Sequence, residues 1–194
     1  MIAAVILAAG ESKRMKSPKM LLPFMGSTII ECVIRNTLAS DVDSAIVVTG
    51  AWKEDIEEVV RKYNVRIVFN DSYTDGMLSS VQCGIKSLPA DCNAALVIPG
   101  DMPLISGDVI NEVINSYITS GKPMIVPVYR GRRGHPLLVG SDLFGEIHRL
   151  DKNEGLRQLA EWHPEDIYET ETGDDTILKD IDTKTEYRKE INSN

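Results

Sequence analysis

The chain has 194 residues, of which 43% are hydrophobic and 26% charged, and its formal net charge at pH 7 is −8. This length and composition are typical of one compact globular domain and exclude global disorder. The longest unbroken apolar run, residues 2–9, is too short to span a membrane and follows no basic segment, so neither an anchor nor a secretory signal is expected. The negative charge argues against bulk nucleic-acid binding, and three cysteines without a C-x-x-C pair indicate a reducing cytoplasm.

The charge is distributed unevenly along the chain. Residues 11–20 hold four cations against one acidic side chain, whereas residues 165–182 hold eight acidic residues against one lysine. A short basic loop in an acidic protein favours a small polyanionic ligand over a long one.

Strand and helix patterns alternate from the N-terminus onward. Apolar runs rich in β-branched residues predict strands buried on both faces at 2–7, 45–48, 65–69 and 94–98. Apolar residues at three- and four-residue spacing predict helices at 28–38, 55–62, 77–88 and 109–118. This alternation predicts βαβ units and a mostly parallel sheet.

The pattern changes from about residue 123. A strand is expected at 124–129, followed by a basic turn at 130–134 and a hairpin partner at 137–139. The remaining predicted elements are helices at 142–150, 153–162 and 183–191 and a strand at 167–170. No repeat or Gly-, Pro- or Ser-rich linker divides the chain, which favours a single domain.

The first candidate site, LAAGESKRMKSPKMLLPFMG at residues 7–26, follows the first predicted strand. Ligands of an open α/β sheet bind where its strands end. The small residues at 8–10 allow backbone N–H groups to approach phosphate oxygens, and Ser12 adds a hydroxyl. Arg14 and Lys19 can converge on the same polyphosphate. We interpret the segment as an anion-binding loop; the alternative is a solvated basic loop.

Two acidic segments are candidates for a metal site. In VIPGDMPLIS, residues 97–106, Asp101 follows a buried strand, and a carboxylate there can hold Mg²⁺ together with phosphate oxygens. In KDIDTKTEY, Asp180 and Asp182 flank Ile181 and would face the same way if Ile181 points inward on a short strand. The alternatives are a simple turn at Asp101 and a helix cap at Asp182.

Two further segments carry hydrogen-bond donors. Residues 70–85 place Gly76 and Ser80 at a predicted helix start, where N–H groups and hydroxyls can read a base or ribose or merely begin the helix. The sequence YRGRRGHP places Arg132 and His135 in a turn. Their side chains could donate hydrogen bonds to a ligand; the alternative is an exposed basic turn that binds nothing.

Taken in order, these motifs resemble one family. The patterns are L-A-A-G-x-S-x-R-M-x-x-x-K-x-L-L-P, N…D-G-M-x-x-S, P-G-D-M-P-L, G-R-R-G-H-P and D-I-D-T. They resemble the nucleotidyltransferases of the molybdenum-cofactor type, and L-A-A-G with G-R-R-G-H-P is similar to the molybdenum cofactor cytidylyltransferases among them. The resemblance implies a Rossmann-like α/β nucleotidyltransferase fold, with a mostly parallel mixed sheet and helices on both faces. It also implies one domain, 1–194, with a nucleotide-binding half at about 1–105 and an acceptor-binding half at about 106–194.

The implied reaction is attack by the phosphate of molybdopterin, or of the molybdenum cofactor, on the α-phosphorus of CTP, with release of pyrophosphate. Mg²⁺ is the implied cofactor, and a molybdenum hydroxylase that receives the product is an implied partner. Arg14, Lys19 and Asp101 would be catalytic, and Asp101 and Asp182 would bind the metal. Arg132 and His135 would face the acceptor. The residues implied to line the nucleotide are Leu7, Ala8, Ala9, Gly10, Ser12, Arg14, Lys19, Gly76, Ser80, Pro99 and Gly100.

Three other functions are compatible with the motifs. One is a guanylyltransferase acting on the same pterin, and the second is a cytidylyltransferase acting on another phosphorylated small molecule, such as a sugar or polyol phosphate. The third is a chaperone that binds the cofactor and inserts it into a hydroxylase. Nucleotide binding without pyrophosphate release would favour the chaperone.

Overall fold

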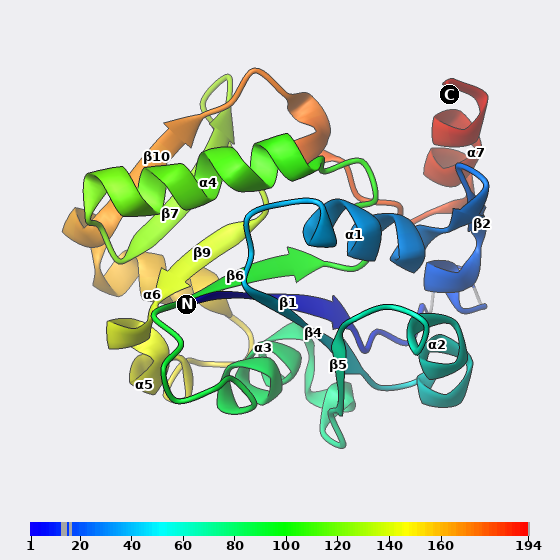
Figure 1. Cartoon of the computed structure of the whole chain (residues 1–194), viewed down its shortest axis with the longest axis horizontal. Helices are drawn as coiled ribbons and strands as arrows, with labels where there is room; N and C mark the ends of the chain where they lie inside the picture. The colour runs from blue at the N-terminus through cyan, green and yellow to red at the C-terminus, as the bar shows by residue number, and fades with distance from the viewer. Residues whose placement is uncertain (13–14, 16, 194) are drawn as a thin grey trace.

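The computed structural model describes residues 1–12, 15 and 17–193 (Figure 1). Its main sheet contains β1 (Ile2–Ala8), β4 (Ser44–Thr49), β5 (Arg66–Phe69), β6 (Ala94–Pro99), β7 (Met124–Tyr129), β8 (Arg132–Arg133), β9 (Leu137–Gly140) and β10 (Ile167–Glu171). A separate two-stranded hairpin contains β2 (Pro23–Phe24) and β3 (Ser27–Thr28). The helices are α1 (Ile29–Leu38), α2 (Lys53–Val60), α3 (Met77–Lys86), α4 (Gly107–Ser120), α5 (Phe144–Ile147), α6 (Leu156–Trp162) and α7 (Lys184–Ser193). Within the described residues, no helix is long and apolar enough to cross a membrane.

The main sheet is mixed and mostly parallel, as predicted. Its order is β10-β7-β9-β6-β1-β4-β5, with β8 paired to β7 outside this path. Strand β9 runs antiparallel to both β6 and β7, and the predicted pairing of 137–139 with 124–129 is confirmed by the register Met124↔Val139. The basic turn pairs with β7 through β8, because Val128 and Tyr129 lie opposite Arg133 and Arg132.

The prediction that 65–69 is buried on both faces is wrong. Strand β5 is the edge of the sheet and pairs only with β4 in the described structure, so Arg66 is exposed and Phe69 is 43% exposed. Its apolar run has the length and β-branched character of a central strand, and only the strand order places it at the edge. The exposed Phe69 ring is covered by a cation, since Lys53 Nζ lies 4.8 Å from its centroid.

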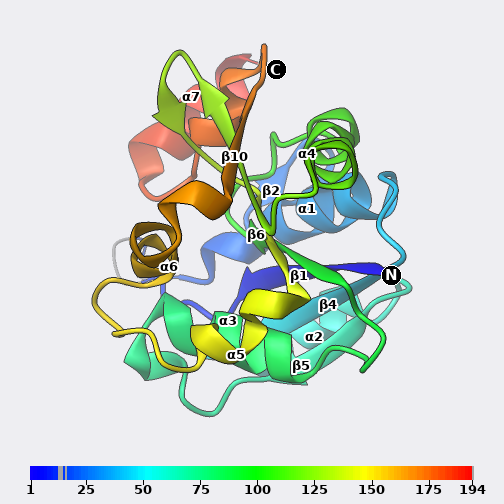
Figure 2. The same cartoon turned by 90° about the vertical axis from the view of Figure 1, so that its left-hand side faces the viewer.

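Helices cover both faces of the sheet, as expected from the family resemblance (Figures 1 and 2). Apolar side chains of α1, α2 and α4 form one core with the sheet, and those of α3, α5 and α6 form a second core on the opposite face. The helices predicted at 142–150 and 153–162 are shorter, because 3₁₀ and turn conformations occupy residues 141–143 and 152–155. Helix α7 lies beside the β2 hairpin, where the Tyr187 hydroxyl donates to the Pro23 carbonyl at 2.6 Å.

The order of the strands creates a crevice at one edge of the sheet. Strand β1 has β4 on one side and β6 on the other, both parallel to it. The chain passes from β1 to β4 and β5 on one side and then crosses to β6 on the other side of β1. In open α/β sheets such a switch point, at the C-terminal ends of the strands, is where ligands bind.

The first turn of α1 is anchored by a buried carboxylate. Glu31 completes a capping box with Thr28, and its carboxylate also accepts from the Tyr63 hydroxyl at 3.1 Å and pairs with Lys62 Nζ at 2.5 Å. Burial alone would raise the pKa of Glu31, but the hydrogen bonds from Lys62, Thr28, Ser27 and Tyr63 outweigh it and lower the pKa to about 2. These contacts tie α1 to the end of the α2 segment.

Replacing Glu31 with glutamine is expected to destabilise the fold by about 2 kcal/mol at neutral pH, since the variant loses hydrogen bonds to a charged group. The folded-state pKa lies below the ordinary value of 4.5, so this contribution is complete above pH 4.5 and is lost as the pH falls toward 2. Urea unfolding from pH 7 to pH 2.5 measures it. Glu161→Gln, which removes only an exposed pair with Arg157, should change stability by less than about 0.5 kcal/mol.

Candidate active site

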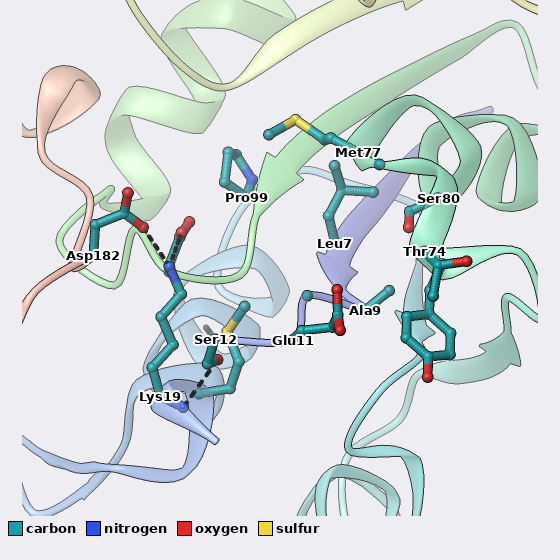
Figure 3. A pocket seen from close by; sticks show the side chains of 15 residues that line it. Leu7, Ala9, Glu11, Ser12, Lys19, Thr74, Met77, Ser80, Pro99 and Asp182 are labelled. Carbon is teal, nitrogen blue, oxygen red and sulfur yellow. Dashed lines mark hydrogen bonds and ion pairs between the residues drawn. The ribbon is translucent and has the colours of Figure 1, made fainter. Parts of the chain in front are cut away.

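A cavity of about 450 Å³, here called the strand-end cavity, lies at the C-terminal ends of β1 and β6. Figure 3 shows Lys19 and Asp182 on one side of it and Thr74 and Ser80 on the other, with Leu7 and Ala9 between them. Its lining residues are Leu7, Ala9, Gly10, Glu11, Ser12, Lys19, Met20, Tyr73, Thr74, Gly76, Met77, Ser80, Pro99, Asp101 and Asp182. Segments far apart in the sequence therefore meet at the switch point of the sheet.

The ends of β1 and β6 approach each other closely. The Gly100 N–H donates to the Leu7 carbonyl at 2.9 Å, and a Cβ atom at position 100 would lie 2.6 Å from that oxygen. Glycine is needed here because the Leu7 carbonyl oxygen belongs to the backbone of β1 and cannot shift without displacing the strand. This contact places Asp101 at the opening of the cavity.

Replacing Gly100 with alanine is expected to cost about 1–3 kcal/mol of stability, the usual range for forcing atoms into a packed site. The shifted strand end would also displace the Asp101 carboxylate and lower activity. Thermal unfolding measures the first effect. Gly10→Ala is the matched control, because a Cβ atom there meets nothing within 4 Å and stability should be nearly unchanged.

Ser12 links the end of β1 to the segment that begins the 3₁₀ turn at Lys19. This residue has a φ of 53°, in the left-handed region that non-glycine residues rarely adopt. Its carbonyl accepts from Met15 N at 2.9 Å, and its hydroxyl oxygen accepts from Lys19 N at 3.3 Å. The loop thus leads directly into the 3₁₀ turn Lys19–Leu21, which carries the Lys19 side chain. Arg14, predicted to bind phosphate, lies outside the described residues.

Lys19 joins the two predicted metal ligands. Its Nζ lies 2.6 Å from Asp101 Oδ2 and 2.6 Å from Asp182 Oδ1, and the residue is only 8% exposed (Figure 3). Burial by itself would lower the pKa of Lys19, but the charges and hydrogen bonds of Asp101 and Asp182 outweigh it and raise the pKa. Lys19 is therefore an ammonium ion bridging two carboxylates.

The structure distinguishes Asp180 from Asp182. Ile181 is 1% exposed and its N–H donates to the Asp101 carbonyl at 2.9 Å, so it points inward as expected, but residues 179–182 do not form a strand. Asp182 reaches the strand-end cavity, whereas Asp180 lines a neighbouring cavity. Burial, followed by the charges of Asp182 and Asp101, raises the pKa of Asp180.

The residues present fit a divalent cation that shares its ligands with a substrate. The two carboxylates converge on one point, the Lys19 ammonium nitrogen, and oxygen ligands of this kind suit Mg²⁺ or Mn²⁺. Among the described residues, no group of three or more His, Cys, Asp or Glu side chains is arranged to hold a metal. Phosphate oxygens and water would have to complete the coordination shell, as is usual for Mg²⁺.

Most of the predicted nucleotide residues line the strand-end cavity, with two exceptions among those described. The Ala8 side chain is fully buried in the core with α1 and α2, and Gly100 is buried where it supports the strand end. The site residues predicted from the sequence do not include five that also line this cavity: Glu11, Met20, Tyr73, Thr74 and Met77. Tyr73, Thr74 and Met77 lie close to Gly76, whose φ of 98° turns the chain before α3. The glycine at this helix start is the sequence feature that could have indicated these three residues.

A second opening adjoins the first. A cavity of about 270 Å³, here called the bridging cavity, is lined by Met77, Pro99, Asp101, Met102, Arg132, Arg133, Gly134, His135, Ile177, Leu178 and Asp180. It contains both predicted acceptor residues, Arg132 and His135. Within the described structure His135 Nδ1 is buried without a hydrogen-bond partner, and burial lowers the pKa of this side chain despite the nearby charge of Asp101.

A switch-point cavity that holds a buried lysine between two carboxylates suits a phosphate-bearing ligand and a divalent cation, the chemistry that a nucleotidyltransferase requires. Residues 4–167 match the MobA-like NTP transferase domain, and the chain belongs to that family. It is 28% identical over 187 residues to the molybdenum cofactor cytidylyltransferase of Escherichia coli K12, covering 96% of this chain and 93% of that protein.

Two solved structures have the same fold. A nucleotidyl transferase from Methanothermobacter is 27% identical, with a TM-score of 0.82 over 100% of this chain and 97% of that one. Rv0371c of Mycobacterium tuberculosis, solved in complex with manganese, is 22% identical, with a TM-score of 0.85 over 100% of this chain and 99% of that one.

Proposed function

We propose that this nucleotidyltransferase transfers CMP from CTP to the phosphate of molybdopterin or the molybdenum cofactor and releases pyrophosphate. The observation that carries the reaction type is the bridge from Lys19 to Asp101 and Asp182 at the switch point of the sheet. The choice of CTP and of the pterin acceptor is supported by the likeness to the Escherichia coli cytidylyltransferase along almost the whole chain. The cytosine dinucleotide product would be consumed by a molybdenum hydroxylase.

In this proposal the nucleotide occupies the strand-end cavity. Backbone N–H groups at residues 9–12 face its phosphates, and Lys19 and Arg14 neutralise their charge. Thr74 and Ser80 lie on the opposite wall and would contact the base or ribose (Figure 3). The proposed halves, 1–105 for the nucleotide and 106–194 for the acceptor, both contribute to this cavity, because Asp182 of the second half lines it.

The bond changes are simple. An acceptor phosphate oxygen forms a bond to the α-phosphorus of CTP, the bond from that phosphorus to the bridging oxygen breaks, and pyrophosphate leaves with the electron pair. The acceptor is already an anion, so no general base is needed, and the chain's task is to position two anions and neutralise them. Asp101 and Asp182 would hold Mg²⁺, which when bound supplies charge neutralisation on the phosphate oxygens. Manganese in the structure of Rv0371c supports a divalent ion.

The test is incubation of the protein with molybdopterin, Mg²⁺ and each nucleoside triphosphate in turn, followed by pyrophosphate detection. We expect release with CTP at least ten times faster than with GTP. Faster release with GTP would reassign the protein as a guanylyltransferase on the same pterin. Release with a polyol or sugar phosphate but not with molybdopterin would reassign the acceptor, and binding of CTP without any release would favour the chaperone.

A further inference from the structure

A small apolar cluster, here called the support cluster, contains a residue near each charged residue of the active site along the chain. Its buried members are Phe24, Ile29, Cys32 and Ile181, and Leu22, Leu104 and Tyr187 pack against them. Leu22 lies shortly after Lys19, and Leu104 lies shortly after Asp101. Ile181 directly precedes Asp182. The three charged groups are therefore attached, through short stretches of backbone, to one packed group of side chains.

The backbone of Asp182 is held on both sides. On one side Ile181 is buried in the support cluster, and its N–H donates to the Asp101 carbonyl at 2.9 Å. On the other side the chain leads into α7, where Glu186 Oε2 accepts from Asp182 N at 3.0 Å. Asp182 is thus tied both to the segment of Asp101 and to the first turn of α7.

Glu186 also organises the start of α7. Its Oε2 atom accepts from Thr183 N at 2.7 Å and from the Thr183 hydroxyl at 2.9 Å. The Thr183 hydroxyl oxygen accepts in turn from Glu186 N at 3.2 Å, so the two residues form a capping box. Because one carboxylate both caps the helix and holds the N–H of Asp182, the place of Asp182 is coupled to the formation of α7.

The next residue, Tyr187, fixes α7 to the segment that carries Lys19. Its hydroxyl donates to the Pro23 carbonyl at 2.6 Å, and its side chain packs against the support cluster. Pro23 follows Leu22, whose N–H donates to the Lys19 carbonyl at 3.1 Å. Figure 1 shows α7 beside the β2 hairpin. Two neighbouring residues of α7 therefore contact the two segments from which Lys19 and Asp182 reach the strand-end cavity.

We propose that α7 is a positioning element of the active site, and that Glu186 and Tyr187 are positioning residues for the Asp182 carboxylate. This inference rests on the proposed function, because it takes Asp182 as a ligand of the divalent ion. Neither positioning residue is among the described residues that line the strand-end and bridging cavities, so both act through Asp182. Partners that orient a metal ligand typically contribute about 10–100-fold to metal affinity.

The direction of a short side chain depends strongly on its backbone, because an aspartate has few staggered conformations to choose from. Without the bond to Glu186, the backbone of Asp182 loses one of its two fixed sides, and the carboxylate can turn away from Asp101. Small divalent ions require oxygen ligands at nearly ideal distances and angles, so a small displacement of one carboxylate weakens binding.

The experiment measures Mn²⁺ binding by electron paramagnetic resonance of the free ion, without nucleotide or turnover. The parent protein is Lys19→Met, because it lacks the ammonium ion that lies between the two carboxylates. Adding Glu186→Ala should raise the dissociation constant for Mn²⁺ about tenfold. Adding Tyr187→Phe, which removes the bond to Pro23 and keeps the ring, should raise it about threefold.

Two further variants separate positioning from other effects. Glu186→Gln removes the same negative charge as Glu186→Ala, but its amide oxygen can still accept the N–H bonds of a capping box, so Mn²⁺ binding should stay within about twofold of the parent. Gly121→Ala is the control for lost stability. It strains the C-terminal end of α4, where φ is 65°, and Gly121 lines neither the strand-end nor the bridging cavity.

The outcomes also separate this inference from the proposed function. Equal Mn²⁺ binding in all variants overturns the role of α7 and leaves the proposed reaction standing. Equal weakening in Glu186→Gln and Glu186→Ala, or in Gly121→Ala and Glu186→Ala, also overturns it, because lost charge or lost stability would then be the cause. A parent protein that binds no Mn²⁺ overturns both this inference and the metal assignment, whereas a different nucleotide or acceptor overturns only the proposed function. Thermal unfolding verifies that each variant is folded at the working temperature, and the two Glu186 variants decide alone if Tyr187→Phe is not.

Discussion

Asp101→Asn is expected to lower the rate of pyrophosphate release by about 10²–10³ while the protein stays folded, the usual effect of removing one group that stabilises charge in the transition state. Asparagine keeps the size of the side chain and can still accept a hydrogen bond from Lys19, and the backbone bond from Ile181 N to the carbonyl of residue 101 is unaffected. What is lost is one negative charge at the cleft. Steady-state assays with CTP, together with thermal unfolding, measure both parts of the prediction.

Asp182 and Asp180 provide comparisons for the Asp101→Asn variant. Asp182→Asn should behave like Asp101→Asn, because both oxygens contact Lys19 and both side chains line the strand-end cavity. Asp180→Asn should reduce the rate by less than about tenfold, since Asp180 lines only the bridging cavity. A loss in Asp180→Asn as large as in Asp101→Asn, or near-wild-type turnover in Asp101→Asn, would contradict the assignment of these groups.

Lys19→Met is expected to change two measured quantities in opposite directions. Pyrophosphate release should fall by about 10²–10³, because a cation that faces the triphosphate is removed. The affinity of the nucleotide-free protein for Mn²⁺ should rise by at least about tenfold. An ammonium ion and a divalent cation cannot occupy the space between the same two carboxylate oxygens, so the free enzyme must give up the Lys19 bridge before it binds metal there.

Electron paramagnetic resonance of free Mn²⁺ measures this affinity directly and does not depend on activity. Lys62→Met is the matched control. Lys62 also pairs with a buried carboxylate, that of Glu31, but neither residue lines the strand-end cavity, so its replacement should leave Mn²⁺ binding unchanged. Unchanged or weaker Mn²⁺ binding in Lys19→Met would show that the ammonium does not compete with the metal. With CTP present, the difference between wild type and Lys19→Met should shrink, because phosphate draws Lys19 away from the carboxylates in the wild-type protein.

The exchange also suggests how binding is ordered. A nucleotide that arrives with its metal brings phosphate oxygens for Lys19 and a cation for the two carboxylates at the same time, so no charge in the cleft is left unpaired. Metal alone would have to expel a buried ammonium ion with nothing to receive it. We therefore expect the metal ion to bind together with the nucleotide rather than before it.

Local patterns in the amino-acid sequence are enough to predict the class of fold and the order of most elements. Continuous apolar runs and three- to four-residue spacing report local burial, so the strands at 2–7, 94–98 and 124–129 and the long helices were predicted to within a few residues. The same patterns place Lys19 and Asp101 in segments that follow buried strands, and such segments lie at the binding edge of a parallel sheet.

Which elements are neighbours is known only from the packing of the folded chain. A periodic pattern shows that a face is buried but not against what, so neither the edge position of β5 nor the place of β9 between β6 and β7 followed from it. The partners of Lys19 lie 82 and 163 positions away along the chain. Val97 of β6 and Leu156 of α6 pack in the same core although many residues separate them along the chain. Such contacts depend on how distant faces pack together, which local sequence does not encode.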